Sequence, residues 1–180
     1  MKQPKVIHTD KYFDLVDVDG HVGIRSKHMT VGVLPYTTDD NGMIEKIGIL
    51  NEYNTFREGN YCDTIITGTV EYEDDSLLFT AIRELKEEGG INMEGDNTEK
   101  WIFLGSVYTS KDSDKIIPLF AVNVTGKDIN KPQGDGSKKE KLSEFSLVPV
   151  GDGLVSEESL LLSAFLRLFN FMYAKSMNNV

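Results

Sequence analysis

Three features of the sequence predict a single α/β or α+β domain that spans residues 1–180. The first half reads as short β-rich segments separated by turns, and the hydrophobic period then changes to that of a helix. Strand-like segments return after this helix, and a second, longer helix closes the chain. A chain of 180 residues suits one domain with a proper core, and neither an internal repeat nor a linker divides it.

The strands are predicted from alternating or β-branched runs that end at turn signals. Asp19-Gly20 is one such signal, and Asp39-Asp40-Asn41-Gly42 is a stronger one between two β-rich runs that should form a hairpin. Gly68 ends a later β-branched run. The expected strands, in chain order, cover residues 12–17, 21–25, 29–36, 43–50, 62–67, 101–108, 115–124 and 144–150.

The two helices are predicted from apolar residues that recur every three or four positions. The first covers residues 76–88, with Ser76 or Asp75 as its N-cap and Gly89-Gly90 as its end. The second covers about residues 156–175, and its broad apolar face should pack against the sheet rather than hold a cofactor. Residues 125–141 lack any periodicity and are predicted to form a surface loop.

The composition excludes several classes of function. A net charge of −10 without a basic patch argues against non-specific nucleic-acid binding. The single cysteine, Cys62, makes neither an internal disulfide nor a thiolate zinc cluster by itself. Residues 1–10 lack a hydrophobic signal segment, and no stretch approaches the roughly 18 apolar residues of a membrane span. We therefore expect a cytoplasmic protein without nucleic-acid or membrane partners.

Residues 83–91 read Arg-Glu-Leu-Lys-Glu-Glu-Gly-Gly-Ile and are the most informative stretch of the chain. At roughly 100° per residue, Glu84, Glu87 and Glu88 share one face of the predicted helix. Such close like charges repel one another unless a cation lies among them. Carboxylate oxygens are ligands that Mg²⁺ prefers, so we expect a metal site here rather than a solvated acidic helix end.

This stretch resembles the end of the Nudix box, the signature of the Nudix hydrolases. The box consists of Gly, five residues, Glu, seven residues, and then Arg-Glu-apolar-any-Glu-Glu-any-Gly-apolar; residues 83–91 fit every specified position. The front of the box departs from this pattern. Counting back from Arg83 reaches Asp75 in place of Glu, and Gly68 is then one residue too far upstream, which implies an extra residue in the loop 70–74.

Beyond the box, the order of residues 51–57, 65–71 and 144–150 is similar to the ADP-ribose pyrophosphatase branch of that family. The resemblance implies an α/β/α sandwich around a mixed β-sheet. It also implies hydrolysis of the pyrophosphate bond of a nucleoside diphosphate linked to another moiety, most simply ADP-ribose or a related nucleotide sugar. A homodimer is implied too, in which N-terminal strands within residues 1–28 exchange between subunits. These strands would otherwise form a hairpin folded on their own domain.

The resemblance assigns metal-binding roles to four residues. Glu84 and Glu88 are expected to bind Mg²⁺ directly, with Mn²⁺ as the alternative ion. Glu87 is expected to be a further ligand or the base that positions the attacking water. The backbone carbonyl of Thr67, just before Gly68, is a further expected ligand.

Other residues are expected to act around the metal. Arg83 should pair with the helix carboxylates and fix their rotamers. Glu144 is the favoured general base, because it borders a predicted strand, and Glu140 is the other candidate. Arg57 is expected either to contact the substrate phosphates or to form a surface salt bridge.

The sequence leaves two alternatives to this function open. The first is a Nudix-fold module that binds a nucleotide without cleaving it, and the second is an enzyme that acts on another substrate. Within the enzyme class, dinucleoside polyphosphates, NADH, coenzyme A derivatives and oxidised nucleoside triphosphates are alternative substrates, because loops outside the box determine specificity.

Overall fold

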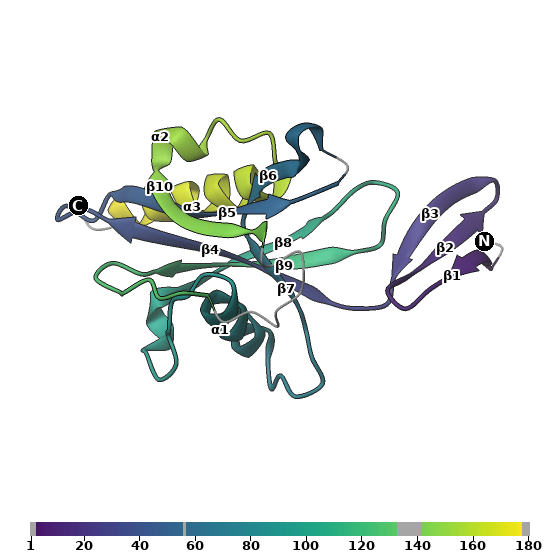
Figure 1. Ribbon diagram of the computed structural model, residues 1–180, viewed down its shortest axis with the longest axis horizontal. Coiled ribbons are helices and arrows are strands. Elements are labelled where there is room, and N and C mark those ends of the chain that lie inside the picture. The colour runs from purple at the N-terminus through teal and green to yellow at the C-terminus, as the bar shows by residue number, and fades with distance from the viewer. Residues whose placement is uncertain (1–2, 56, 133–141, 178–180) are drawn as a thin grey trace.

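The computed structural model describes residues 3–55, 57–132 and 142–177. Ten strands and three α-helices follow one another in these segments (Figure 1). The strands are β1 (Lys5–Thr9), β2 (Phe13–Val18), β3 (His21–Ser26), β4 (Thr30–Thr38), β5 (Ile44–Tyr53), β6 (Tyr61–Thr64), β7 (Ile66–Thr69), β8 (Trp101–Tyr108), β9 (Ile116–Asn123) and β10 (Glu144–Pro149). The helices are α1 (Leu77–Glu87), α2 (Val150–Gly153) and α3 (Ser159–Met177), with single 3₁₀ turns η1 (Glu58–Asn60) and η2 (Thr98–Lys100).

A seven-stranded sheet forms the centre of the molecule. Its strand order is β10-β5-β4-β9-β8, with β6 paired to β5 and β7 paired to β4. Strands β4 and β9 are parallel, whereas the other pairs in this sheet are antiparallel. The sheet is therefore mixed, as the resemblance implied.

The two long helices cover opposite faces of the sheet, and this arrangement creates two hydrophobic layers (Figure 1). Ala81 and Leu85 of α1 pack with Val31 and Val33 of β4 on one face. Residues of α3 that include Leu161 and Leu168 pack with Leu34 and Ile47 on the other. This α/β/α sandwich confirms the predicted fold class. No helix among the described residues is long and apolar enough to cross a membrane.

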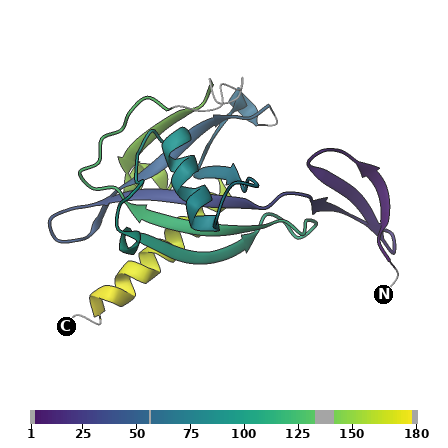
Figure 2. The same cartoon turned by 90° about the horizontal axis from the view of Figure 1, so that it is seen from below.

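Strands β1 to β3 form a separate antiparallel sheet, which we call the N-terminal arm. The arm projects from one end of the main body (Figures 1 and 2). Its contacts with the body include hydrogen bonds from the Ile24 amide to the Asp112 carbonyl (2.8 Å) and from the Ser26 amide to Asp114 Oδ1 (2.7 Å). Strands β2 and β3 occur where two strands were predicted and pair antiparallel, whereas β1 was not predicted. The hairpin predicted around residues 39–42 is formed by β4 and β5.

The other differences from the sequence predictions are local. Residues 62–67 were predicted as one strand, but the chain changes partners at the buried Ile65, so that β6 pairs with β5 and β7 with β4. Helix α3 begins at Ser159 rather than Ser156. Residues 156–158 form its cap instead, because Ser156 Oγ accepts a hydrogen bond from the Glu158 amide and Glu158 Oε2 accepts one from the Leu161 amide. In the predicted loop 125–141, residues 133–141 lie outside the described residues.

Candidate active site

Helix α1 presents the three carboxylates and is fixed at both ends. Ser76 is the N-cap, as predicted, and its Oγ accepts a hydrogen bond from the Phe79 amide at 3.1 Å. Gly90, just past the helix, has a φ of +66°, and a side chain there would collide with the backbone of Asn130. Both ends therefore hold the acidic half of α1 in place against strands β4 and β7.

Gly68 of β7 lies directly beneath Glu84. The Glu84 residue is only 7% exposed. A Cβ atom at Gly68 would overlap the Cγ and Cδ atoms of Glu84. Glycine is therefore required at position 68, because only a residue without a side chain leaves room for the carboxyl group of Glu84 against β7.

Replacing Gly68 by Ala should displace the Glu84 carboxylate. Overpacking costs typically about 1–3 kcal/mol, and about 1.4 kcal/mol is tenfold in an equilibrium constant, so we expect Mn²⁺ affinity to fall roughly tenfold or more. Titration of free Mn²⁺ by electron paramagnetic resonance measures this. Gly151→Ala is the matched control, because a Cβ at Gly151 meets nothing within 4 Å. Equal Mn²⁺ binding by the Gly68→Ala protein and the control would contradict the assignment.

Arg83 joins the carboxylates of α1 to the end of β7. Its Nη1 atom lies 2.8 Å from Glu84 Oε1 and 2.9 Å from Glu87 Oε2. Its Nη2 atom donates a hydrogen bond to the Thr69 carbonyl at 2.9 Å. One cationic nitrogen thus lies between two carboxylates, so Glu84 and Glu87 surround a position that suits positive charge.

The carboxylate that orients Arg83 is Asp74, whereas counting along the box pointed to Asp75. Asp74 accepts hydrogen bonds from Nε and Nη2 of Arg83 at 3.2 Å and 3.0 Å, from Thr80 Oγ1 at 2.8 Å and from the Glu71 amide at 2.9 Å. Its side chain is only 2% exposed, while Asp75 is exposed to solvent. Burial raises the pKa of Asp74, but the hydrogen bonds from Arg83, Glu71 and Thr80 outweigh it and hold the pKa below its ordinary value.

This contact changes how the box is aligned. Asp74 follows Gly68 after five intervening residues, which is the spacing of the front of the box. The extra residue therefore lies between Asp74 and Arg83, not between Gly68 and the acidic residue. Counting forward from Gly68 would have found Asp74, whereas counting back from Arg83 missed it. No sequence pattern predicted a role for Thr80 or for the Thr69 carbonyl.

Glu84 has a strongly perturbed acidity. Burial raises its pKa to about 7; the charge of Arg83 opposes the rise, and the nearby Glu87 adds to it. Because a bound cation favours the charged carboxylate, a metal ion at this position would lower the pKa again. Protons and metal ions are therefore expected to compete for Glu84 near neutral pH.

The metal-free protein should lose stability as the pH rises from about 5 to about 8, because the pKa of Glu84 is about 7 in the folded protein and has its ordinary value of 4.5 in the unfolded chain. In that window the folded protein holds a proton that the unfolded chain has released. The stabilisation is complete below the unfolded pKa and is lost as the pH rises through the folded one. Thermal melts in chelator should show this slope in the wild type but not in Glu84→Gln, which has no carboxyl to titrate. Identical slopes would refute the assignment.

The residues around α1 supply the donor atoms that a magnesium ion requires, but they are not arranged as a complete site. Among the described residues, no three His, Cys, Asp or Glu side chains are grouped closely enough to hold an ion. Two carboxylates already contact a single cationic atom, and carboxylate oxygens suit a hard divalent cation. Glu88 is the C-cap of the same helix, and its Oε2 atom is buried. Thr67 lies in β7 next to Gly68.

The structure does not bring the other predicted residues to α1. Alternate residues of β10 face opposite sides of the sheet: Phe145 packs in the α1 layer, while Val148 packs in the α3 layer. Glu144 shares its side of the strand with Val148 and therefore lies on the face away from α1. Glu140 lies outside the described residues.

Arg57 lines a polar groove of about 590 Å³ that is separate from the α1 carboxylates. The residues described as lining it come from β6 and from the segment 155–158 before α3; they include Cys62, Asp63 and Glu157. Helix α1 contributes none of these lining residues. Contact between Arg57 and a phosphate held at α1 is thus not supported by this arrangement.

Comparison with protein-family models and with characterised protein sequences gives no match. Comparison with solved structures does. The crystal structure of an ADP compounds hydrolase superposes with a TM-score of 0.65 over 97% of this chain and 97% of its own, at 15% sequence identity. A MutT structure, from work on Aliivibrio salmonicida and Vibrio cholerae, matches with a TM-score of 0.48 over 79% of this chain and 98% of its own, at 16% identity, which is too distant to add to the argument. The chain therefore has a Nudix-type fold.

Proposed function

We propose that this protein is a Nudix pyrophosphatase that hydrolyses a nucleoside diphosphate linked to another moiety, with ADP-ribose or a related nucleotide sugar as its substrate and Mg²⁺, or Mn²⁺, as its cofactor. One observation supports the proposal most strongly: Glu84 and Glu87 meet around one cationic position on α1. The fold of that ADP compounds hydrolase supports the substrate class.

Each residue of the site has a separate part in this proposal. Glu84, Glu87 and Glu88 hold the ion, with the Thr67 carbonyl as a further ligand. When bound, the ion would screen the charge of the pyrophosphate and lower the pKa of coordinated water. Asp74 orients Arg83, and Arg83 keeps Glu84 and Glu87 in place. Glu87 is more exposed than Glu84, with 40% of its side chain accessible. It is therefore the better placed of these two carboxylates to orient an incoming water.

The proposal includes a homodimer formed through the N-terminal arm. The arm projects from the body and exposes Val6, Ile7 and Val22. Exchange of arms between two copies would cover these side chains.

A second candidate function is a module that binds a nucleotide without cleaving it. The position of Arg83 favours this candidate, because its guanidinium already pairs with Glu84 and Glu87 without a metal ion. In such a module, Arg83 would be a permanent structural cation.

A panel of nucleotides separates the two candidates and identifies the substrate. Purified protein is incubated with Mg²⁺ and ADP-ribose, NADH, diadenosine polyphosphates or nucleoside triphosphates, and the products are resolved chromatographically. Release of AMP and ribose 5-phosphate from ADP-ribose, abolished by a chelator, is the expected result. Cleavage of another compound would keep the mechanism and change the substrate. Calorimetric binding of a nucleotide without any cleavage would favour the binding module.

A further inference from the structure

Helix α3 carries a second apolar stripe on the side that points away from the sheet. Its inward residues, such as Leu161 and Leu168, are buried in the core. The second stripe, which we call the outer stripe, is exposed and consists of Leu162, Leu166, Phe169, Tyr173 and Met177. These residues are three or four positions apart, so at about 100° per residue they stay within a sector of roughly 80°.

The outer stripe is too continuous to be ordinary surface. Leu166 is 67% exposed, and Tyr173 is 57% exposed. Figure 2 shows that the C-terminal part of α3 extends past the edge of the sheet, where the body of this chain does not cover it. Single exposed apolar side chains are common, but a contiguous apolar patch marks an interaction surface. A helix with apolar residues on both faces is normally covered on both.

The charge distribution indicates what covers this stripe. The chain has 29 acidic residues and a net charge of −10, yet residues 159–177 of α3 contain none of them. The neighbouring strand β8 has no charged residue at all. Facing like charges prevent association, so two copies of this acidic protein can approach through this surface with less repulsion than elsewhere.

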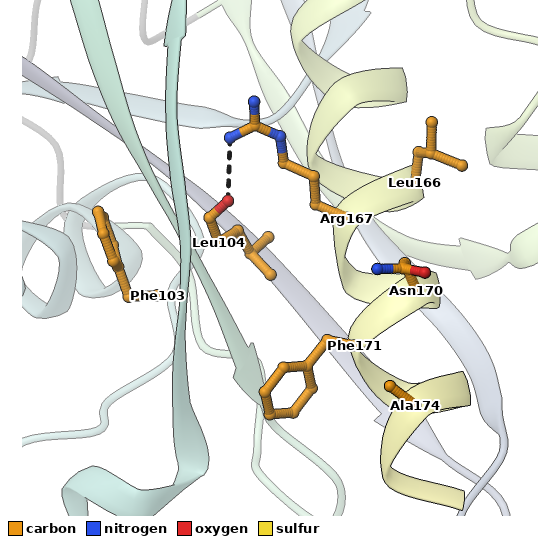
Figure 3. A pocket seen from close by; sticks show the side chains of 7 residues that line it. All are labelled: Phe103, Leu104, Leu166, Arg167, Asn170, Phe171 and Ala174. Carbon is orange, nitrogen blue, oxygen red and sulfur yellow. Dashed lines mark hydrogen bonds between the residues drawn. The ribbon is translucent and has the colours of Figure 1, made fainter. Parts of the chain in front are cut away.

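A groove of about 680 Å³ lies between β8 and α3, beside the outer stripe. Figure 3 shows Leu166 and Phe171 on opposite sides of the helix, with Phe171 directed toward β8. Arg167 reaches across the groove, and its Nη1 donates to the Leu104 carbonyl at 2.9 Å (Figure 3). The same nitrogen also donates to the Ser106 carbonyl at 3.1 Å. The only basic side chain in this part of the helix is thereby tied to β8 and directed away from the outer stripe.

We propose that the outer stripe packs antiparallel against the outer stripe of a second copy of this chain. The stripe residues follow one another at spacings of four, three, four and four, and apolar residues three or four positions apart are those by which two helices interlock side chains. A two-fold axis near Phe169, in the middle of the stripe, makes the interface self-complementary. Phe169 and Tyr173 are each about half exposed, so each can bury on the order of 100 Å². With the two leucines and Met177, each copy offers on the order of 400 Å² of apolar area, about half of the roughly 800 Å² that a standard interface buries per partner.

The test is the molar mass of the full chain, measured by analytical ultracentrifugation over a dilution series. Leu166→Glu should halve the mass and weaken self-association at least about 100-fold, because a symmetric interface receives the new charge twice. Val155→Glu is the matched control: it adds the same charge at an exposed apolar residue that precedes α3 and is not part of the outer stripe, and the mass should not change. Ile7→Glu probes the N-terminal arm and should leave the α3 contact intact.

A second experiment does not depend on weakening the protein. Phe169→Cys in a Cys62→Ser background places a thiol beside its symmetry mate, so mild oxidation should give a covalent dimer, while Val155→Cys in the same background should not. Circular dichroism confirms that each variant is folded. A monomeric wild type, a mass unaffected by Leu166→Glu, or association lost only with Ile7→Glu would each overturn the proposal. None of these experiments requires nucleotide hydrolysis, so their result is independent of the proposed enzyme activity.

Discussion

Replacing Glu87 by Gln should reduce the turnover of ADP-ribose on the order of 10³-fold while the protein stays folded. Gln keeps the shape of the side chain but removes the charge that, with Glu84, surrounds the cationic position at Arg83 Nη1. The same change also removes the group that we expect to orient the attacking water. Steady-state AMP release at saturating Mg²⁺ measures the effect.

Glu94→Gln is the matched control for this variant. Glu94 also forms an ion pair with α1, through Lys86 at 2.9 Å, but it lies outside the carboxylate face. This control should retain nearly full activity, since exposed ion pairs contribute about 0–1 kcal/mol. Wild-type turnover in Glu87→Gln, with a wild-type melting curve, would exclude the proposed mechanism.

Replacing Asp74 by Asn should destabilise the fold by about 2–3 kcal/mol, because it leaves the guanidinium of Arg83 without its buried counter-charge. For a chain of this size, that corresponds to a melting temperature lower by roughly 5–10 °C. The loss should extend to function, because Arg83 also contacts Glu84 and Glu87. A higher Mg²⁺ concentration should then be needed for half-maximal activity.

Asp75→Asn gives a control one residue away. Asp75 is exposed, whereas the Asp74 side chain is 2% exposed and bonded to Arg83 and Thr80. The Asp75 variant should therefore melt within about 1 °C of the wild type. The opposite ranking, with Asp75→Asn more damaging than Asp74→Asn, would show that the box is aligned as counting back from Arg83 suggested.

The elements that the sequence predicted well are those with strong local signals. Helix α1 has an N-cap at Ser76, a regular apolar spacing and a glycine at its end, and each feature acts within a few residues. Strands β4, β5, β8 and β9 have long apolar runs bounded by turns. Strand β1 was missed because all five of its residues are exposed, so its hydrophobic pattern does not alternate.

The rest depended on contacts between distant parts of the chain. The change of strand partner at Ile65 depends on the pairing of β6 with β5 and of β7 with β4. No local sequence pattern predicts this pairing. Similarly, the placement of Arg57 and Glu144 away from α1 follows from the strand order and from the alternation of β10. The proximity of Glu84 and Glu87 was accessible to prediction, because residues three positions apart on one helix are neighbours by geometry alone. The predicted group of three carboxylates is not formed among the described residues.

Direct binding of Mn²⁺ to the metal-free protein tests the central claim most directly. Free Mn²⁺ is followed by electron paramagnetic resonance while wild-type protein, Glu84→Gln or the double variant Glu84→Gln/Glu87→Gln is added. We predict saturable binding to the wild type that Mg²⁺ displaces, weaker binding to the single variant, and none to the double variant. Equal binding by all three proteins would show that the ion binds elsewhere, and the carboxylates of α1 would then be a structural ion-pair network around Arg83.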